Sequence, residues 1–145
     1  MSTPTTDRTT HRRQITEVVL RLLAATGLAV DAAVHLHLAG RYDAVTADIS
    51  QGTLFRAEAA AAALALVLVL LWRRPLGDLF AWAVAAAGLA ALLLYRYVDV
   101  GAHGPLPDMY EPLWYTDKTL TACAQAVATL CLTALLVGHR RRAPS

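Results

Sequence analysis

Apolar residues in this chain gather into four long runs that are separated by short polar segments. The runs cover about 15–39, 54–72, 79–98 and 119–138. A helix needs roughly 20 mostly apolar residues to cross a bilayer core, and each run has about that length. The second run contains AAAAALALVLVLLW and the third contains LFAWAVAAAGLAALLLY, and neither shows a polar face at helical spacing. The pattern therefore predicts an all-α fold, an integral membrane bundle of four transmembrane helices.

Composition agrees with this prediction and excludes other classes. Of 145 residues, 57% are hydrophobic and 17% are charged, whereas an average soluble domain is about 45–50% apolar and about 25% charged. A chain this apolar is not dominated by disorder. The net charge is only +2 and the sequence has no clustered basic face, so no nucleic-acid partner is predicted.

The positions of the arginines predict how the bundle is oriented. One side of the predicted bundle carries most of them: Arg8, Arg12, Arg13, Arg73, Arg74, Arg140, Arg141 and Arg142. The predicted outer loops, 40–53 and 99–118, instead hold most of the acidic residues. By the positive-inside rule both termini lie in the cytoplasm (N-in/C-in), with 1–14 a disordered tail and 139–145 a basic tail. Twelve arginines against one lysine, with abundant alanine, are typical of a high-GC bacterium, which indicates a bacterial cytoplasmic membrane.

Ionisable residues inside the predicted spans point to a candidate site, because each is costly in a membrane. The first run carries Asp31 and His35 on one helical face, and the fourth run carries Thr121, Gln125, Thr129 and Thr133 at spacings of four, again on one face. Counting depth from the outer ends places five ionisable residues together: Asp31, His35, Arg56, Glu58 and Arg96. Two interpretations stay open, a self-neutralising network that fixes helix register, or an outward-facing site for a proton, a metal or a small polar ligand.

The sequence offers one set of candidate metal ligands and no histidine pair for haem. Asp31, His35 and Glu58 are the candidate metal ligands, since the first two are one helical turn apart. The second, third and fourth runs contain no histidine, so haem between helices is not expected. No cofactor is predicted.

The longest loop, DVGAHGPLPDMYEPLWYTD over 99–117, is too rich in proline and glycine for a regular helix. Its candidate interaction residues are Asp108, Tyr110, Glu111, Trp114 and Tyr115. Three roles are open: a loop that rests at the membrane surface, a lid over the polar cluster, or a docking surface for an extracytoplasmic partner.

The start of the first run, VLRLLAATGLAVDAAVHL, resembles the DoxX-like family of small bacterial membrane proteins, through Arg21 and Gly27. The resemblance implies a four-helix membrane architecture and association with membrane redox complexes.

The chain shows no Ser/His/Asp, Gly-rich phosphate or His/Cys zinc pattern. We therefore expect a non-enzymatic accessory or interaction subunit with a membrane or extracytoplasmic protein partner. The alternative is a redox-associated, or ligand-, proton- or metal-binding, subunit that uses the polar cluster. Runs of alanine and glycine permit close helix contacts, within the bundle or in a homo-oligomer.

Overall fold

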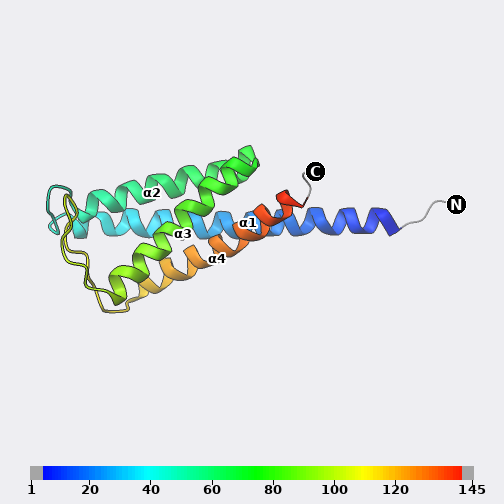
Figure 1. Ribbon diagram of the computed structural model, residues 1–145. Coiled ribbons are helices and arrows are strands. Elements are labelled where there is room, and N and C mark those ends of the chain that lie inside the picture. Colours follow the sequence, from blue (N-terminus) through cyan, green and yellow to red (C-terminus); the bar gives the residue numbers. More distant parts are fainter. Residues whose placement is uncertain (1–4, 142–145) are drawn as a thin grey trace.

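The computed structural model describes residues 5–141, and every regular element in that range is helical (Figure 1). The elements are α1 (Thr5–Ala39), the 3-10 turn η1 (Gly40–Tyr42), α2 (Gln51–Val67), the π-helical turn η2 (Leu68–Trp72), α3 (Pro75–Tyr97) and α4 (Thr116–Arg140). Within residues 5–141, four helices are long and apolar enough to cross a membrane, with α2 and η2 forming one of them. The all-α prediction and the number of candidate spans are confirmed.

Local signals extend two of the helices beyond the apolar runs. Ser50 caps α2, because its hydroxyl accepts a hydrogen bond from the Thr53 amide at 3.0 Å, so α2 begins at Gln51. Pro75 opens α3, where its fixed φ suits the first helical position and its missing N–H costs nothing. Asp78 consequently lies in the first turn of α3 rather than in a connecting loop.

Residues 5–14, which fall in the predicted disordered tail 1–14, continue α1 in one piece toward the N-terminus. No proline or glycine interrupts the chain between Thr5 and Thr26, and extending an existing helix is far less costly than starting one. At the other end, α4 runs through Arg140 instead of ending at 138. Residues 1–4 and 142–145, which belong to the two predicted tails, lie outside the described part of the chain.

Small side chains form the core. α1 packs mainly against α4 and α2, and α3 packs against α4. The fully buried positions are mostly alanine, with larger residues few: Ala24, Leu28, Ala62, Ala65, Val69, Ala81, Ala85, Ala128 and Leu132. A Cβ on Gly27 would collide with the Ala124 carbonyl oxygen, so the α1–α4 contact requires glycine there. Small residues at such crossings let helix backbones approach closely.

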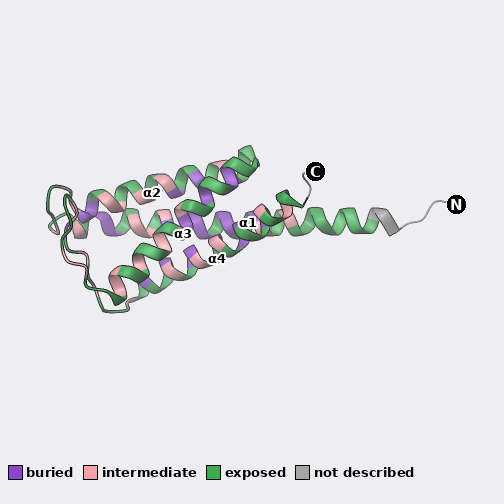
Figure 2. Cartoon of the chain, in the orientation of Figure 1, coloured by how far each residue is buried: buried purple, intermediate pink, exposed green. Residues whose placement is uncertain are grey.

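Exposed residues recur along all four helices (Figure 2), and many of them are large and apolar. Leu71 is 79% exposed and Leu130 is 70% exposed, and similar residues recur along all four helices. The bundle is therefore apolar both inside and outside, apart from its two ends and two buried polar groups.

The two ends of the bundle differ (Figure 1). The loop end carries segments 43–50 and 98–115, which contact each other where the Ile49 amide donates to the Pro105 carbonyl at 3.0 Å. The terminal end carries the start of α1, the end of α4 and the connection from η2 to α3.

Candidate functional site

Two of the five residues predicted to cluster lie elsewhere. Arg56 forms a bidentate ion pair with Asp43, at 2.7 and 2.8 Å, on the exposed surface of the loop end. Arg56 and Glu58 are two residues apart on α2, or about 200° around the helix, so their side chains diverge. Arg96 lies over the rings of Tyr97 and Trp114, 4.8 and 5.4 Å from their centroids.

The remaining three residues come together with Gln125 and form what we call the acidic cluster: Asp31, His35, Glu58 and Gln125. Asp31 Oδ1 accepts a hydrogen bond from Gln125 Nε2 at 2.9 Å and lies 2.9 Å from His35 Nδ1. His35 Nδ1 also lies 3.0 Å from the Asp31 carbonyl oxygen. Both of these neighbours are acceptors, so Nδ1 carries the hydrogen and Nε2 is the nitrogen left to exchange protons.

Gly88 on α3 makes room for this cluster. A Cβ at Gly88 would overlap the Gln125 amide nitrogen and would lie 2.8 Å from Glu58 Oε1. Glu58 and Gln125 thus meet against the bare backbone of α3, and helices α1, α2 and α4 each contribute side chains.

The acidic cluster contains more acceptors than donors. Asp31 is fully buried, yet its Oδ2 has no hydrogen-bond partner within residues 5–141. The same is true of Glu58 Oε1 and Gln125 Oε1. Buried polar atoms are normally paired, so these oxygens require donors, which a proton between the Asp31 and Glu58 carboxyl groups or a ligand in the adjoining cavity can supply.

A cavity of about 220 Å³ adjoins the cluster on the side of the loop end. His35 and Glu58 line its inner part, and Phe55 and Tyr95 form aromatic walls. The Phe55 ring stands edge-on to His35, with centroids 5.1 Å apart. Apolar residues complete the lining, including Val34, Leu38, Leu54 and Leu92.

The 98–115 loop covers this cavity. Glu111 and Tyr115 line it, and the Glu111 amide donates to the Tyr95 carbonyl at 3.0 Å, which ties the loop to the end of α3. The Glu111 carboxylate accepts hydrogen bonds from the Tyr42 and Tyr115 hydroxyls at 3.1 and 3.2 Å. Lys118 Nζ lies 3.1 Å from Glu111 Oε2. Of the three roles open for the loop, its position over the cavity favours a lid.

Burial and the neighbouring Tyr42 hydroxyl raise the pKa of the Tyr115 phenol above its usual range. The nearby Glu111 carboxylate raises it further, because a second negative charge is unfavourable there. Tyr115 therefore stays protonated and keeps donating its hydrogen bond.

The predicted loop interaction surface divides into two groups. Asp108, Tyr110 and Trp114 are exposed, and Asp108 accepts a hydrogen bond from the Tyr110 amide at 3.0 Å. Glu111 and Tyr115 instead turn inward to the cavity. One segment of the loop therefore carries both the residues that cover the cavity and the residues that form the outer surface.

The candidate metal ligands do not form a metal site. Within the described chain no group of three His, Cys, Asp or Glu side chains is arranged to hold a metal ion. Asp31 and His35 pair with each other through Oδ1 and Nδ1, so this pair is held together without a metal ion.

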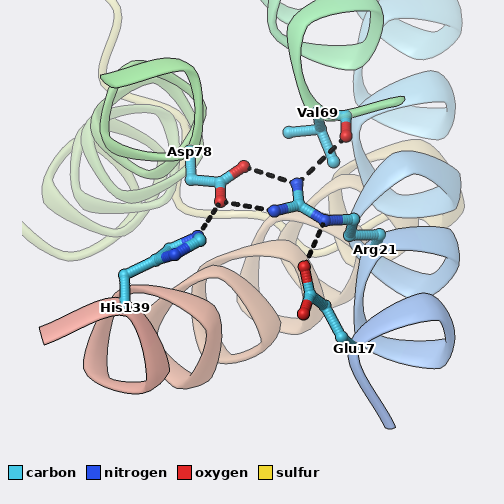
Figure 3. Close-up of polar contacts among 5 residues, drawn as sticks. All are labelled: Glu17, Arg21, Val69, Asp78 and His139. Carbon is cyan, nitrogen blue, oxygen red and sulfur yellow. Dashed lines mark hydrogen bonds and ion pairs between the residues drawn. The ribbon is translucent and has the colours of Figure 1, made fainter. Parts of the chain in front are cut away.

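A second buried polar group, which we call the terminal-end network, was not predicted from the sequence (Figure 3). Arg21 forms a bidentate ion pair with Asp78 at 2.8 and 2.9 Å, and both side chains are almost fully buried. Arg21 also donates to the Val69 carbonyl at 3.1 Å and lies 3.4 Å from Glu17. His139 Nε2 lies 3.0 Å from the second Asp78 oxygen.

Asp78 and His139 were missed because they stand at the edges of apolar runs, where charged residues are expected in solvent. The available signal was the sequence Pro75–Leu76–Gly77–Asp78, since proline at the first helical position places the aspartate in the first turn, where it is favoured.

Comparison with known proteins adds no relative: no family model, no curated protein and no solved structure matches this chain.

Proposed function

We propose that this chain is an integral protein of a bacterial cytoplasmic membrane, with both termini in the cytoplasm. The apolar outer surface of all four helices supports insertion, because exposing so much apolar surface to water is unfavourable. The arginines at the terminal end and the acidic residues at the loop end support the orientation.

Cysteine labelling tests this topology. In a Cys123→Ala/Cys131→Ala background, we expect a membrane-impermeant thiol reagent to label Asp48→Cys from outside intact cells. Pro144→Cys should react only after the membrane is opened. The reverse pattern would contradict the orientation, and recovery of the protein in the soluble fraction would contradict insertion itself.

Within this membrane protein, we propose that the cavity at the loop end binds a small organic ammonium cation. The observation that carries the proposal is the excess of acceptors and negative charge beside aromatic walls. Three carboxyl groups, of Asp31, Glu58 and Glu111, face one ammonium group, of Lys118, so the site stays negative when His35 is neutral, even with one proton shared between Asp31 and Glu58. Acidic sites lined by aromatic rings are well suited to organic ammonium ions.

The individual side chains have distinct roles in this proposal. The Glu58 carboxylate supplies the counter-charge, since within residues 5–141 it forms no ion pair with lysine or arginine. The rings of Phe55 and Tyr95 contact the apolar body of the ligand. The 98–115 loop, held by Glu111, closes the site and keeps water out.

Binding measurements on the detergent-purified protein test the site. We expect choline to bind at least about 10-fold more tightly than its uncharged isostere, in which carbon replaces nitrogen. Glu58→Gln keeps the shape of the side chain and should remove this preference, whereas Asp43→Asn, a carboxylate lost outside the cavity, should leave it intact. Equal binding of the two probes, or a preference that survives Glu58→Gln, would contradict the proposal.

A second function is favoured by the exposed part of the lid. Leu113 is 70% exposed and lies between the exposed Trp114 and the proline-rich turn of the loop. An accessory subunit that contacts an extracytoplasmic or membrane partner through Tyr110, Leu113 and Trp114 fits this surface. Cross-linking from a photoreactive residue at Leu113, compared with Leu71 on the lipid-facing side, would distinguish a partner from lipid contact.

The resemblance to the DoxX-like family stays a proposal. Its two residues, Arg21 and Gly27, have structural tasks in this bundle, one in the terminal-end network and one at the α1–α4 contact. The association with redox complexes therefore has no support from a site built around them.

A further inference from the structure

A second hollow, about 710 Å³, lies at the terminal end, between the start of α1 and the end of α4. We call it the basic groove. Arg12, Arg13 and Arg141 line it, and His139 joins it to the terminal-end network. Its floor is apolar and includes Leu20 and Leu135. The basic groove is thus lined by guanidinium groups, whereas the cavity at the loop end is lined by carboxyl groups.

We propose that the basic groove binds the phosphate headgroup of an anionic phospholipid. The groove lies where the apolar parts of α1 and α4 end, which is the level of the lipid headgroups if the helices span a bilayer. This inference therefore rests on the proposed membrane insertion. Basic pockets between helices on the cytoplasmic side are suited to anionic headgroups, and arginine can bind a phosphate through two parallel hydrogen bonds.

The charges around the groove favour an anion. Three arginines face one lining carboxylate, Glu17. Glu17 lies 3.4 Å from Arg21 Nε, and Arg21 in turn balances the buried Asp78. The guanidinium charge of Arg12, Arg13 and Arg141 thus exceeds the acidic charge that lines the groove.

The apolar floor favours a lipid over a free anion. Leu20, Ala134 and Leu135 give the groove a surface against which the glycerol and upper acyl carbons of a phospholipid can pack. A free phosphate would gain nothing from these contacts, because its favourable interactions are with charge and hydrogen-bond donors alone.

Gly138 offers a way to block the groove without disturbing the fold. It lines the groove, and a Cβ at this position would meet no atom within 4 Å. A leucine there would extend into the groove, and it would also suit the helix better than glycine does.

Native mass spectrometry of the detergent-purified full chain tests the inference, with phosphatidylglycerol, phosphatidylcholine and inorganic phosphate as probes. We expect one phosphatidylglycerol to bind in clear preference to phosphatidylcholine. Arg12→Gln/Arg13→Gln should weaken this binding about 30-fold, from the usual contribution of two basic residues. Gly138→Leu should weaken it with every charge retained. The matched control Arg8→Gln/Arg74→Gln removes two arginines that do not line the groove and should change binding less than about 3-fold.

Other results would overturn the inference. Equal losses in the control and in the Arg12/Arg13 variant would mean that phosphatidylglycerol responds only to overall charge. Unchanged binding in Gly138→Leu would place the lipid outside the groove. Displacement by inorganic phosphate at matched concentration would make it a free-anion site. Since the protein is first shown to fractionate with membranes, failure of the lipid preference is separate from failure of the membrane proposal.

Discussion

Two buried polar groups sit at different levels of the same bundle, and they satisfy their charges in different ways. In the terminal-end network, Arg21 donates to both Asp78 oxygens and to the Val69 carbonyl, and His139 contacts Asp78 as well. In the acidic cluster, three buried oxygens have no partner within the described residues, and a cavity lies beside them. The first group has a partner for every charged side chain, whereas the second has fewer donors than acceptors.

The comparison separates a structural role from a binding role. A buried ion pair with all its hydrogen bonds made fixes the relative positions of helices, and removing one partner leaves a buried charge uncompensated. A cluster with unpaired acceptors costs stability, and such a cost is commonly retained where a site has a function. The contrast supports a folding role for the terminal-end network and is the basis of the binding role that we propose for the acidic cluster.

The largest effect is expected from breaking the terminal-end network. Arg21→Leu should lower the free energy of unfolding in detergent by about 3–5 kcal/mol, because Asp78 would stay buried without its counter-charge. The measurement is equilibrium unfolding of the purified protein. The double variant Arg21→Leu/Asp78→Leu should recover much of the loss, and failure to recover would contradict an ion-pair origin.

A substitution in the acidic cluster should not lower the free energy of unfolding in this way. Glu58→Gln removes one of two neighbouring carboxylates and supplies an amide that can donate hydrogen bonds, so stability should be unchanged or should rise by up to about 1 kcal/mol. A loss as large as that of Arg21→Leu would mean that Glu58 is structural, and the contrast between the two groups would fail.

Much of the fold follows from the sequence, because apolar run length alone predicts helices that can span a bilayer. Helix ends were harder to predict. The Ser50 cap and the Pro75 start act through single hydrogen bonds and one dihedral angle, which hydropathy does not register. The extension of α1 to Thr5 was missed for the same reason, since polar residues carry no apolar signal even inside a helix.

The candidate site was predicted in part. Helical spacing brought Asp31 and His35 together, since both lie on α1, but depth alone then added Arg56 and Arg96. Depth says nothing about the direction in which a side chain points, and the two arginines contact other partners, Asp43 for Arg56 and the Tyr97 and Trp114 rings for Arg96. Gln125 was recognised as part of a polar stripe. Its hydrogen bond to Asp31 depends on the rotation of α4 relative to α1, which cannot be read from a single sequence.

A smaller effect is expected at the lid. Tyr115→Phe removes hydrogen bonds to Glu111 and Tyr42, and should cost about 1–2 kcal/mol of unfolding free energy. The raised pKa of Tyr115 adds a pH dependence. The folded state holds the phenol protonated, so its contribution is complete below the ordinary pKa of 10.0 and is lost as pH rises above that value.

Unfolding midpoints of the two proteins between about pH 8 and about pH 11 check both parts of this prediction. The stability advantage of the natural chain over Tyr115→Phe should not change with pH below the ordinary tyrosine pKa of 10.0 and should shrink as pH rises above it. An advantage that grows with pH would contradict the burial of a neutral phenol in the lid.

The smallest effect is expected at the Asp43–Arg56 pair, which lies at the loop end outside the acidic cluster. Both side chains are about half exposed, and exposed ion pairs contribute little. The Arg56 guanidinium lowers the pKa of Asp43, so the pair stabilises the fold above the ordinary value of 3.8 and stops doing so as pH falls below it. Asp43→Asn should therefore differ slightly from the natural chain at neutral pH and converge with it in acid, as measured by unfolding midpoints. If Asp43→Asn instead abolished choline binding, the pair would belong to the site after all, and the acidic cluster would have to be redrawn to include Arg56.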